Sequence, residues 1–331
     1  MGAMRAIEAQ EAGGPDVLQL VEVPEPEPGP GQVLVRPAAV GLNFVETYQR
    51  SGLYPVQHPF RPGGEGAGEV VALGQGVDTV AIGDLVAWTA SVTGSYAELV
   101  VIEQSQALPI PAGLDVRTAA ALPLQGLTVS MLVDGAFELR DGHDVFLTAG
   151  AGGVGSLLTQ VASDRGARVI TTVSTAEKEE LALAAGAADV IRYDQLDDLT
   201  AELTAVVREL TGEQGVHVAY DGVGKSTFDA SLSALRRRGT LVLFGAASGP
   251  VPPVDPQRLN RAGSVFLTRP SMFHFLVEAQ ERSQRWEQVS GWVRDGVVDL
   301  RVGASYPLAE AAAAHRALEG RETTGKVLLI P

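Results

Sequence analysis

Short apolar runs separated by glycine and polar turns fill the first third of the chain. They recur at close, regular spacing, which is typical of β-strands in a compact, barrel-like domain. We therefore expect residues 4–125 to be all-β. The expected strands are Arg5–Ala9, Val17–Val23, Val33–Val40, Gly68–Leu73, Leu85–Thr89 and Tyr96–Ile102.

The pattern of apolar and polar residues then changes to one of strands that alternate with helical segments. A helical stretch is expected over 116–137, with a kink at Pro123. The apolar runs after it predict strands at 145–149, 168–173, 189–192, 216–220 and 240–244. This alternation predicts an open, doubly wound parallel sheet with helices on both faces. Arg236–Arg238, followed by Gly239, is interpreted as the last turn of a helix and its glycine cap rather than as a binding patch.

The carboxy-terminal part contains both helical and strand patterns. Helices are expected over 272–296 and 308–318, and a final strand over 326–330. Pattern alone leaves open whether this tail packs on the parallel sheet or on the amino-terminal domain.

The sequence Gly150-x-Gly152-x-x-Gly155 lies between the strand at 145–149 and a helix. In that position a helix N-terminus can direct backbone N–H groups at a pyrophosphate, and side chains would block its close approach. The motif therefore predicts dinucleotide binding. The alternative is an ordinary glycine-rich turn, since the chain holds 38 glycines.

The next strand bears on which dinucleotide is bound. NAD sites usually place a carboxylate on the ribose hydroxyls at the end of this strand. Here Ser174 and Thr175 stand at that point, and Lys178 follows. Neutral hydroxyls with a cation suit a 2′-phosphate, so we predict NADPH. The alternative is a capping box from Ser174 to Glu177, with Lys178 merely solvated.

Composition narrows the possible functions. A length of 331 residues suggests two domains, and no apolar run is long enough to span a membrane. The net charge of −15 disfavours nucleic acid as a partner. The absence of cysteine excludes disulfides, thiol catalysis and cysteine-ligated zinc, and it favours a cytoplasmic location.

From Met4 to Pro331 the chain resembles the zinc-free, zeta-crystallin-like NADPH:quinone oxidoreductases of the medium-chain dehydrogenase/reductase superfamily. The motifs that carry the resemblance are Gly41–Tyr48, Ser51–Pro55, Pro62–Gly68, Gly126–Val129, Gly150–Gly155, Tyr220–Gly224, Phe244–Gly245 and Thr268–Ser271.

The resemblance implies a GroES-like β-barrel catalytic domain, residues 1–125 and 267–331, and a Rossmann NADPH-binding domain, residues 126–266. It also implies a homodimer that pairs through a late edge strand near Val265–Thr268. The active site would lie in the cleft between the domains.

Site residues follow from the same resemblance. It places Asn43, Tyr48 and Tyr54 as catalytic residues around the nicotinamide and the acceptor. The expected cofactor-binding residues are Asn43, Thr128, Gly150, Gly152, Gly153, Val154, Gly155, Ser174, Lys178, Tyr193, Phe244, Ser248 and Lys326. For the tyrosines the alternative is ordinary packing, and for Asn43 it is a turn or strand-end position.

Zinc is not expected at either a catalytic or a structural site. Zinc-dependent relatives carry Gly-His-Glu where this chain has Gly63-Gly64-Glu65, and a zinc-binding cysteine near the position of Asn43. The five histidines are scattered and lack the spacing of a ligand set.

The expected reaction is hydride transfer from NADPH to a quinone or similar conjugated carbonyl, with the tyrosine hydroxyls near the acceptor oxygen. One-electron transfer stays open. The nearest alternative is an enoyl reductase acting on an α,β-unsaturated ketone or thioester. An alternative of another class is a non-catalytic NADPH-binding sensor or structural protein.

Overall fold

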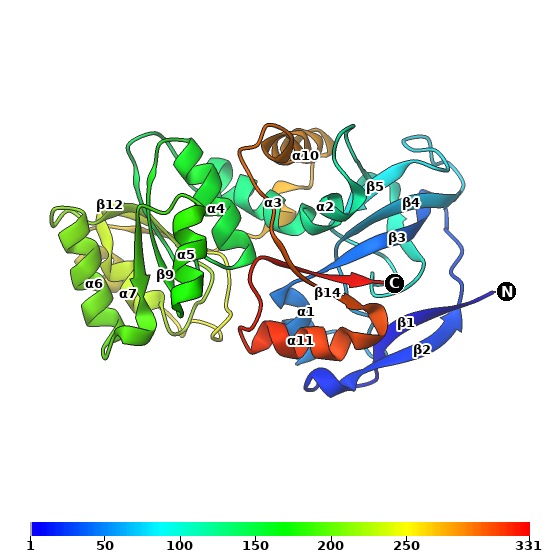
Figure 1. Ribbon diagram of the computed structural model, residues 1–331, viewed down its shortest axis with the longest axis horizontal. Helices are drawn as coiled ribbons and strands as arrows, with labels where there is room; N and C mark the ends of the chain where they lie inside the picture. The colour runs from blue at the N-terminus through cyan, green and yellow to red at the C-terminus, as the bar shows by residue number, and fades with distance from the viewer. Residues whose placement is uncertain (1) are drawn as a thin grey trace. The chain divides into compact units, whose positions relative to one another are not determined.

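The computed structural model describes residues 2–331, which divide into two compact units (Figure 1). Of the described residues, the first contains 2–125, 286–294 and 300–331, and the second contains 126–285 and 295–299. The tail therefore contributes to both units. The expected domain boundaries at residues 126 and 267 stay a prediction.

The second unit is built on a parallel sheet of six strands in the order β10-β9-β8-β11-β12-β13. Its strands are β8 (Asp144–Leu147), β9 (Arg168–Val173), β10 (Asp189–Arg192), β11 (Val216–Asp221), β12 (Leu235–Leu243) and β13 (Phe266–Thr268). All five neighbouring pairs run parallel, as the alternation of strands and helices predicts.

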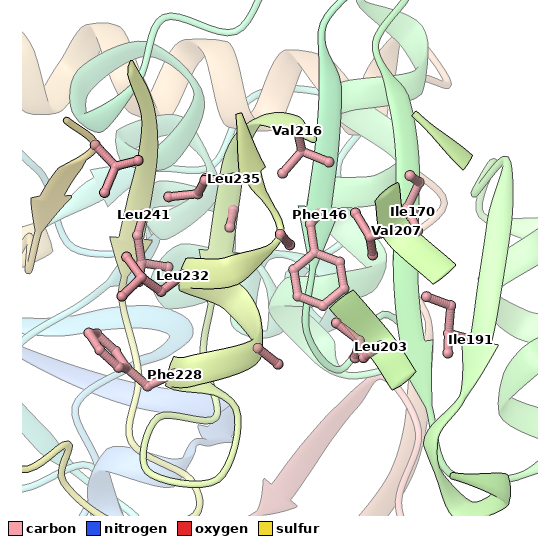
Figure 2. Packing of buried hydrophobic residues seen from close by; sticks show 14 residues of the cluster. Phe146, Ile170, Ile191, Leu203, Val207, Val216, Phe228, Leu232, Leu235 and Leu241 are labelled. Carbon is pink, nitrogen blue, oxygen red and sulfur yellow. The ribbon is translucent and has the colours of Figure 1, made fainter. Parts of the chain in front are cut away.

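Helices cover both faces of this sheet. They are α4 (Gly153–Asp164), α5 (Ala176–Ala184), α6 (Leu199–Leu210), α7 (Phe228–Ser233) and α8 (Pro256–Arg261). Figure 2 shows the core on one face, where Leu203 and Val207 of α6 lie beside Phe146 and Ile170 of the sheet, and Phe228 of α7 lies on the side of Leu241. Burying these apolar side chains fixes the strand ends that carry the expected cofactor residues.

The remaining helices of this unit come before the first strand or after the last strand of the sheet along the chain. They are α3 (Pro123–Ser130), the π-helix η3 (Met131–Ala136) and α9 (Met272–Phe275), together with residues 279–285 of α10 (Ala279–Arg294). Helix α3 begins at Pro123, where the chain was expected to kink. Tyr220 of β11 donates a hydrogen bond to the Leu132 carbonyl of η3 at 3.2 Å.

The first unit contains two sheets. One is the antiparallel pair β1 (Ala3–Ala9) and β2 (Leu18–Pro24). The other has seven strands in the order β14-β15-β3-β4-β5-β7, with β6 also paired to β3. Its members are β3 (Gln32–Leu42), β4 (Gly66–Leu73), β5 (Leu85–Trp88), β6 (Val100–Glu103), β7 (Leu108–Pro109), β14 (Val302–Pro307) and β15 (Lys326–Ile330).

The expectation that residues 4–125 are all-β is wrong where helix α1 (Phe44–Arg50) follows β3. Helix α2 (Val116–Ala121) precedes α3 and lies in the helical stretch that was expected over 116–137. Helix α11 (Ala311–Glu319) crosses from β14 to the parallel strand β15 (Figure 1). Strand β14 was also missed, because its exposed and half-buried residues lack an apolar run.

Arg236–Arg238 lie in strand β12 and not in the last turn of a helix, so that interpretation is wrong. Helix α7 ends at Ser233, and Leu235 already pairs with Val216 of β11. The chain has irregular pairing here, and Arg238 has a φ of 61°. Among the described residues no helix is long and apolar enough to cross a membrane.

Candidate cofactor and active site

The glycine turn joins β8 to α4, and its three motif glycines meet different surroundings. A Cβ on Gly150 would lie 2.3 Å from Thr171 Oγ1, and one on Gly155 would lie 2.2 Å from the Ala149 carbonyl oxygen. Both glycines are therefore required for packing within the fold. A Cβ on Gly152 would meet only the Ala149 oxygen, at 3.2 Å. Space is left in front of Gly152.

The start of α4 suits an anionic ligand. Gly152 is its N-cap and offers no side chain to the first N–H groups of the twelve-residue helix. Gly153 and Val154 form its first turn and are half-buried. Uncapped N–H groups at the positive end of a helix bind phosphate, so the residues fit a dinucleotide pyrophosphate.

Ser174 and Lys178 lie beyond the end of β9, and both are half-buried. The alternative capping box at Ser174 is wrong. Thr175 is the N-cap of α5, and its Oγ1 accepts a hydrogen bond from Lys178 N at 3.2 Å. Ser174 is therefore not needed as a cap. Tyr193 follows β10, which pairs with β9, so these three expected residues lie at neighbouring strand ends.

Arg192 stands beside this group and was not predicted. Its guanidinium makes two hydrogen bonds to the Asp194 carboxylate, at 2.8 and 2.7 Å, and a longer one to Glu179. A basic residue at the end of a short apolar strand, next to Tyr193, was the only signal in the sequence.

The loop after β11 is held by the buried Asp221 carboxylate. It accepts hydrogen bonds from the hydroxyls of Thr227 and Ser231 and from the backbone N–H of Gly224. Phe244 follows β12, and its ring occupies the space where a Cβ on Gly222 would lie. Ser248 Oγ donates to the Val223 carbonyl at 2.8 Å. Phe244 and Ser248 thus lie on the loop after β12, which contacts the loop after β11 at Gly222 and Val223.

Thr128 lies on α3 in the same unit, half-buried, with its hydroxyl 3.8 Å from the Met272 sulfur. This weak contact leaves the Thr128 hydroxyl able to bind a polar ligand group. Its expected role at the nicotinamide stays a prediction.

In the first unit the structure brings Asn43 and Lys326 together in a buried polar cluster. Lys326 Nζ donates to Asn43 Oδ1 at 2.7 Å and contacts the Glu65 carboxylate. Asn43 Nδ2 donates to Glu65 Oε1 at 2.6 Å. Glu65 was not predicted as a site residue. The signal in the sequence was a carboxylate that lies among glycines at the start of an apolar strand, where a charge must be buried and paired.

Glu46 is the second buried carboxylate of this cluster. Its oxygens accept hydrogen bonds from the backbone N–H of Asn43 at 2.8 Å and of Gly64 at 3.2 Å. Burial, together with the negative charge of Glu65, raises the pKa of Glu46 to about 7. The carboxyl is therefore partly protonated near neutral pH.

This shift predicts that stability falls as the pH rises. Between the ordinary pKa of 4.5 and about 7, the folded protein holds the proton and the unfolded chain does not. Folding stability is therefore greatest below pH 4.5 for this group and is lost as the pH rises through 7, by about 3 kcal/mol in total. We expect Glu46→Gln to remove that loss. Melting temperatures from pH 5 to pH 8 test it, with the exposed Glu22→Gln as control, and parallel curves for wild type and Glu46→Gln would contradict it.

Tyr48 and Tyr54 form an aromatic pair at the end of α1. Their ring centroids are 5.3 Å apart in an edge-on arrangement, and Phe44 lies 6.3 Å from Tyr48. Tyr54 is 41 % exposed. An exposed aromatic surface with hydroxyl groups can contact a planar ligand.

A second buried network, made by Arg50, His315 and Tyr96, fixes α1 on α11. Arg50 donates to His315 Nδ1 at 3.1 Å and to the Glu319 carboxylate at 2.7 Å, and Tyr96 lies 3.2 Å from His315 Nε2. Burial lowers the pKa of His315 to about 3, so the imidazole is neutral at physiological pH. The helix that carries Tyr48 is therefore held firmly.

Among residues 2–331, no three His, Cys, Asp or Glu side chains are grouped so that they could hold a metal ion. The cation that faces Glu65 is the ammonium group of Lys326.

The chain is similar to known proteins over nearly its full length. Residues 29–112 match the alcohol dehydrogenase GroES-like domain family, and residues 153–295 match the zinc-binding dehydrogenase family. Quinone oxidoreductase 1 of Escherichia coli is 40% identical over 98% of this chain and 99% of its own. The 2-haloacrylate reductase of a Burkholderia species is 36% identical over 96% of each chain. A solved mycobacterial structure complexed with NADPH is 48% identical, with a TM-score of 0.95 over 99% of this chain and 100% of its own.

Proposed function

The chain belongs to the quinone oxidoreductase family of the medium-chain dehydrogenases/reductases, and on that premise we propose that it reduces quinones with NADPH and without zinc. The observation that carries the proposal is the start of α4, where uncapped N–H groups and the open space at Gly152 fit a pyrophosphate. The E. coli quinone oxidoreductase complexed with NADPH, 39% identical with a TM-score of 0.95, supports it.

NADPH supplies a hydride when it is bound, and the protein binds and orients NADPH and the acceptor. Gly152, Gly153 and Val154 would hold the pyrophosphate, and Ser174, Lys178 and Tyr193 the 2′-phosphate end. Asn43, Thr128, Phe244 and Ser248 would surround the nicotinamide. We assign these roles to the expected domains, 126–266 for the nucleotide and 1–125 with 267–331 for catalysis.

The tyrosine pair would receive the acceptor. A flat quinone suits the exposed aromatic surface, and a hydroxyl can donate a hydrogen bond to the quinone oxygen as negative charge develops there. The reduced quinone can take its protons from water, so a dedicated acid is not required.

We expect Tyr48→Phe and Tyr54→Phe each to lower kcat with a small quinone about tenfold, because each removes one donor to the developing charge. Steady-state kinetics at saturating NADPH measures this, with Tyr306→Phe on β14 as the matched control. Full turnover in both Tyr48→Phe and Tyr54→Phe would end this role for the tyrosines.

An enoyl reductase is the second candidate, favoured by the similarity to the 2-haloacrylate reductase. Such an enzyme must also protonate the α-carbon. A panel of 1,4-benzoquinone, a larger quinone and an enone, each with NADPH, separates the two. Turnover of the enone alone would move this protein to the enoyl reductases.

We also propose a homodimer and a cytoplasmic location. Strand β13 is the edge of the parallel sheet, and its Phe266 is 59 % exposed, so its free backbone groups and apolar surface could pair with a second copy. The absence of cysteine supports the location, and the acidic charge disfavours nucleic acid as a partner. Light scattering of the wild type and of Phe266→Lys tests the dimer.

A further inference from the structure

The cluster of Asn43, Glu46, Glu65 and Lys326 differs from an ordinary core because it places three ionisable side chains where no water reaches. Glu46, Glu65 and Lys326 are each 0 % exposed, whereas Asn43 is 8 % exposed. Asn43 is therefore the member of this cluster through which the buried charges can act on a ligand.

The hydrogen bonds of the Asn43 amide distinguish its two ends. Its oxygen accepts from the Lys326 ammonium at 2.7 Å, and its nitrogen donates to Glu65 Oε1 at 2.6 Å. Turning the amide by 180° would direct its NH2 group at the ammonium and its oxygen at the carboxylate. Both contacts would become repulsive, so the ion pair permits one orientation.

The surrounding backbone holds the ion pair in turn. The second oxygen of Glu65 accepts from Leu124 N at 2.7 Å. A Cβ on Gly41 would lie 2.3 Å from Glu65 Oε1, so a glycine in β3 makes room for the carboxylate. The backbone N–H of Asn43 is held by Glu46. The Glu65 carboxylate and the Asn43 backbone, which flank the amide, are thus both held by further hydrogen bonds.

We propose that Glu65 and Lys326 are positioning residues, which fix the Asn43 amide so that its remaining Nδ2–H donates to a carbonyl oxygen of the bound ligand. The carbonyl belongs either to the nicotinamide carboxamide or to the quinone. This inference rests on the proposed function, because it takes Asn43 to lie at the ligand. Burying an ion pair costs more desolvation free energy than burying apolar side chains of the same size. A purely structural role for Glu65 and Lys326 therefore does not explain why the pair is there.

The side-chain ¹H–¹⁵N signals of Asn43 test the proposal directly. They are identified by their loss in Asn43→Asp. In the free protein we expect two clearly different proton shifts, with the Glu65-bonded proton downfield. NADP⁺ and then 1,4-benzoquinone are added to the same sample, so that no turnover occurs. The second proton is the one that is not bonded to Glu65. If its signal shifts with NADP⁺, the nicotinamide carboxamide is its acceptor; if it shifts only with the quinone, the quinone carbonyl is its acceptor.

The matched variant is the double substitution Glu65→Gln with Lys326→Met, which removes both charges together. Lys326→Met alone would leave a buried carboxylate without its counter-ion. In the double variant we expect the ligand-induced shift to disappear and kcat/KM to fall at least about tenfold, because the amide can then turn. Arg5→Met with Glu98→Gln likewise removes both charges of an ion pair, at a partly exposed site, and should leave the ligand-induced shift and kcat/KM unchanged.

Two results would overturn the proposal. One is a second Asn43 proton that moves with neither ligand in the wild type. The other is a ligand-induced shift that persists unchanged in the double variant. If the shift occurs but no acceptor is reduced, the proposed function fails and the positioning role stands.

Discussion

Gly152→Ala is expected to weaken NADPH binding about 100-fold while the protein stays nearly as stable as the wild type. Gly152 has a φ of −76° and a ψ of 169°, which alanine adopts without strain. Its added Cβ would meet only one protein atom within 4 Å, at 3.2 Å. The methyl group would instead occupy the space through which the pyrophosphate reaches the first N–H groups of α4. Fluorescence titration with NADPH and the melting temperature measure the two effects.

Gly155→Ala is the matched control, with the same atoms added three residues along the motif. Its Cβ would lie 2.2 Å from a backbone oxygen, so β8 and α4 would have to separate. We expect a loss of stability of about 3 kcal/mol, with weak binding as its consequence. If Gly152→Ala bound NADPH as tightly as the wild type, the pyrophosphate would not lie at this turn.

Lys178→Glu is expected to reduce the preference for NADPH over NADH about 100-fold. A charge-assisted hydrogen bond to the 2′-phosphate would be lost, and a carboxylate would repel the phosphate. NADH lacks that phosphate, so its kcat/KM should change little. The measurement is kcat/KM for both cofactors with one quinone.

Arg237→Glu provides the same reversal of charge on an exposed residue near the start of β12, at the amino-terminal ends of the parallel strands. It should leave the preference unchanged, which separates a local contact from the effect of net charge. An unchanged preference in Lys178→Glu would show that Lys178 does not bind the 2′-phosphate.

Much of the fold could be predicted because burial repeats regularly along the chain. Strands β9, β10 and β15 have the bounds that the sequence pattern predicts, 168–173, 189–192 and 326–330. Helix α1 was missed because seven residues between apolar strands show less than two full helical periods. Arg236–Arg238 were misread because basic residues followed by glycine are typical of the end of a helix. The pairs on either side of them, Val216 with Leu235 and Val218 with Thr240, place them in β12.

The site could be predicted only where its residues are close in sequence. The glycine turn is such a case, because strand, turn and helix follow one another directly. The ion pair of Glu65 and Lys326 joins residues 261 positions apart, so no local pattern indicates it. The capping of α5 depended on a choice between two adjacent hydroxyl residues, which the backbone settled in favour of Thr175.

The most direct test of NADPH-dependent, zinc-free quinone reduction is the absorbance of NADPH mixed with 1,4-benzoquinone and chelator-treated protein. We expect rapid loss of absorbance, equal consumption of NADPH and quinone, and a rate that added zinc does not raise. No turnover, or turnover that the chelator abolishes and zinc restores, would contradict it.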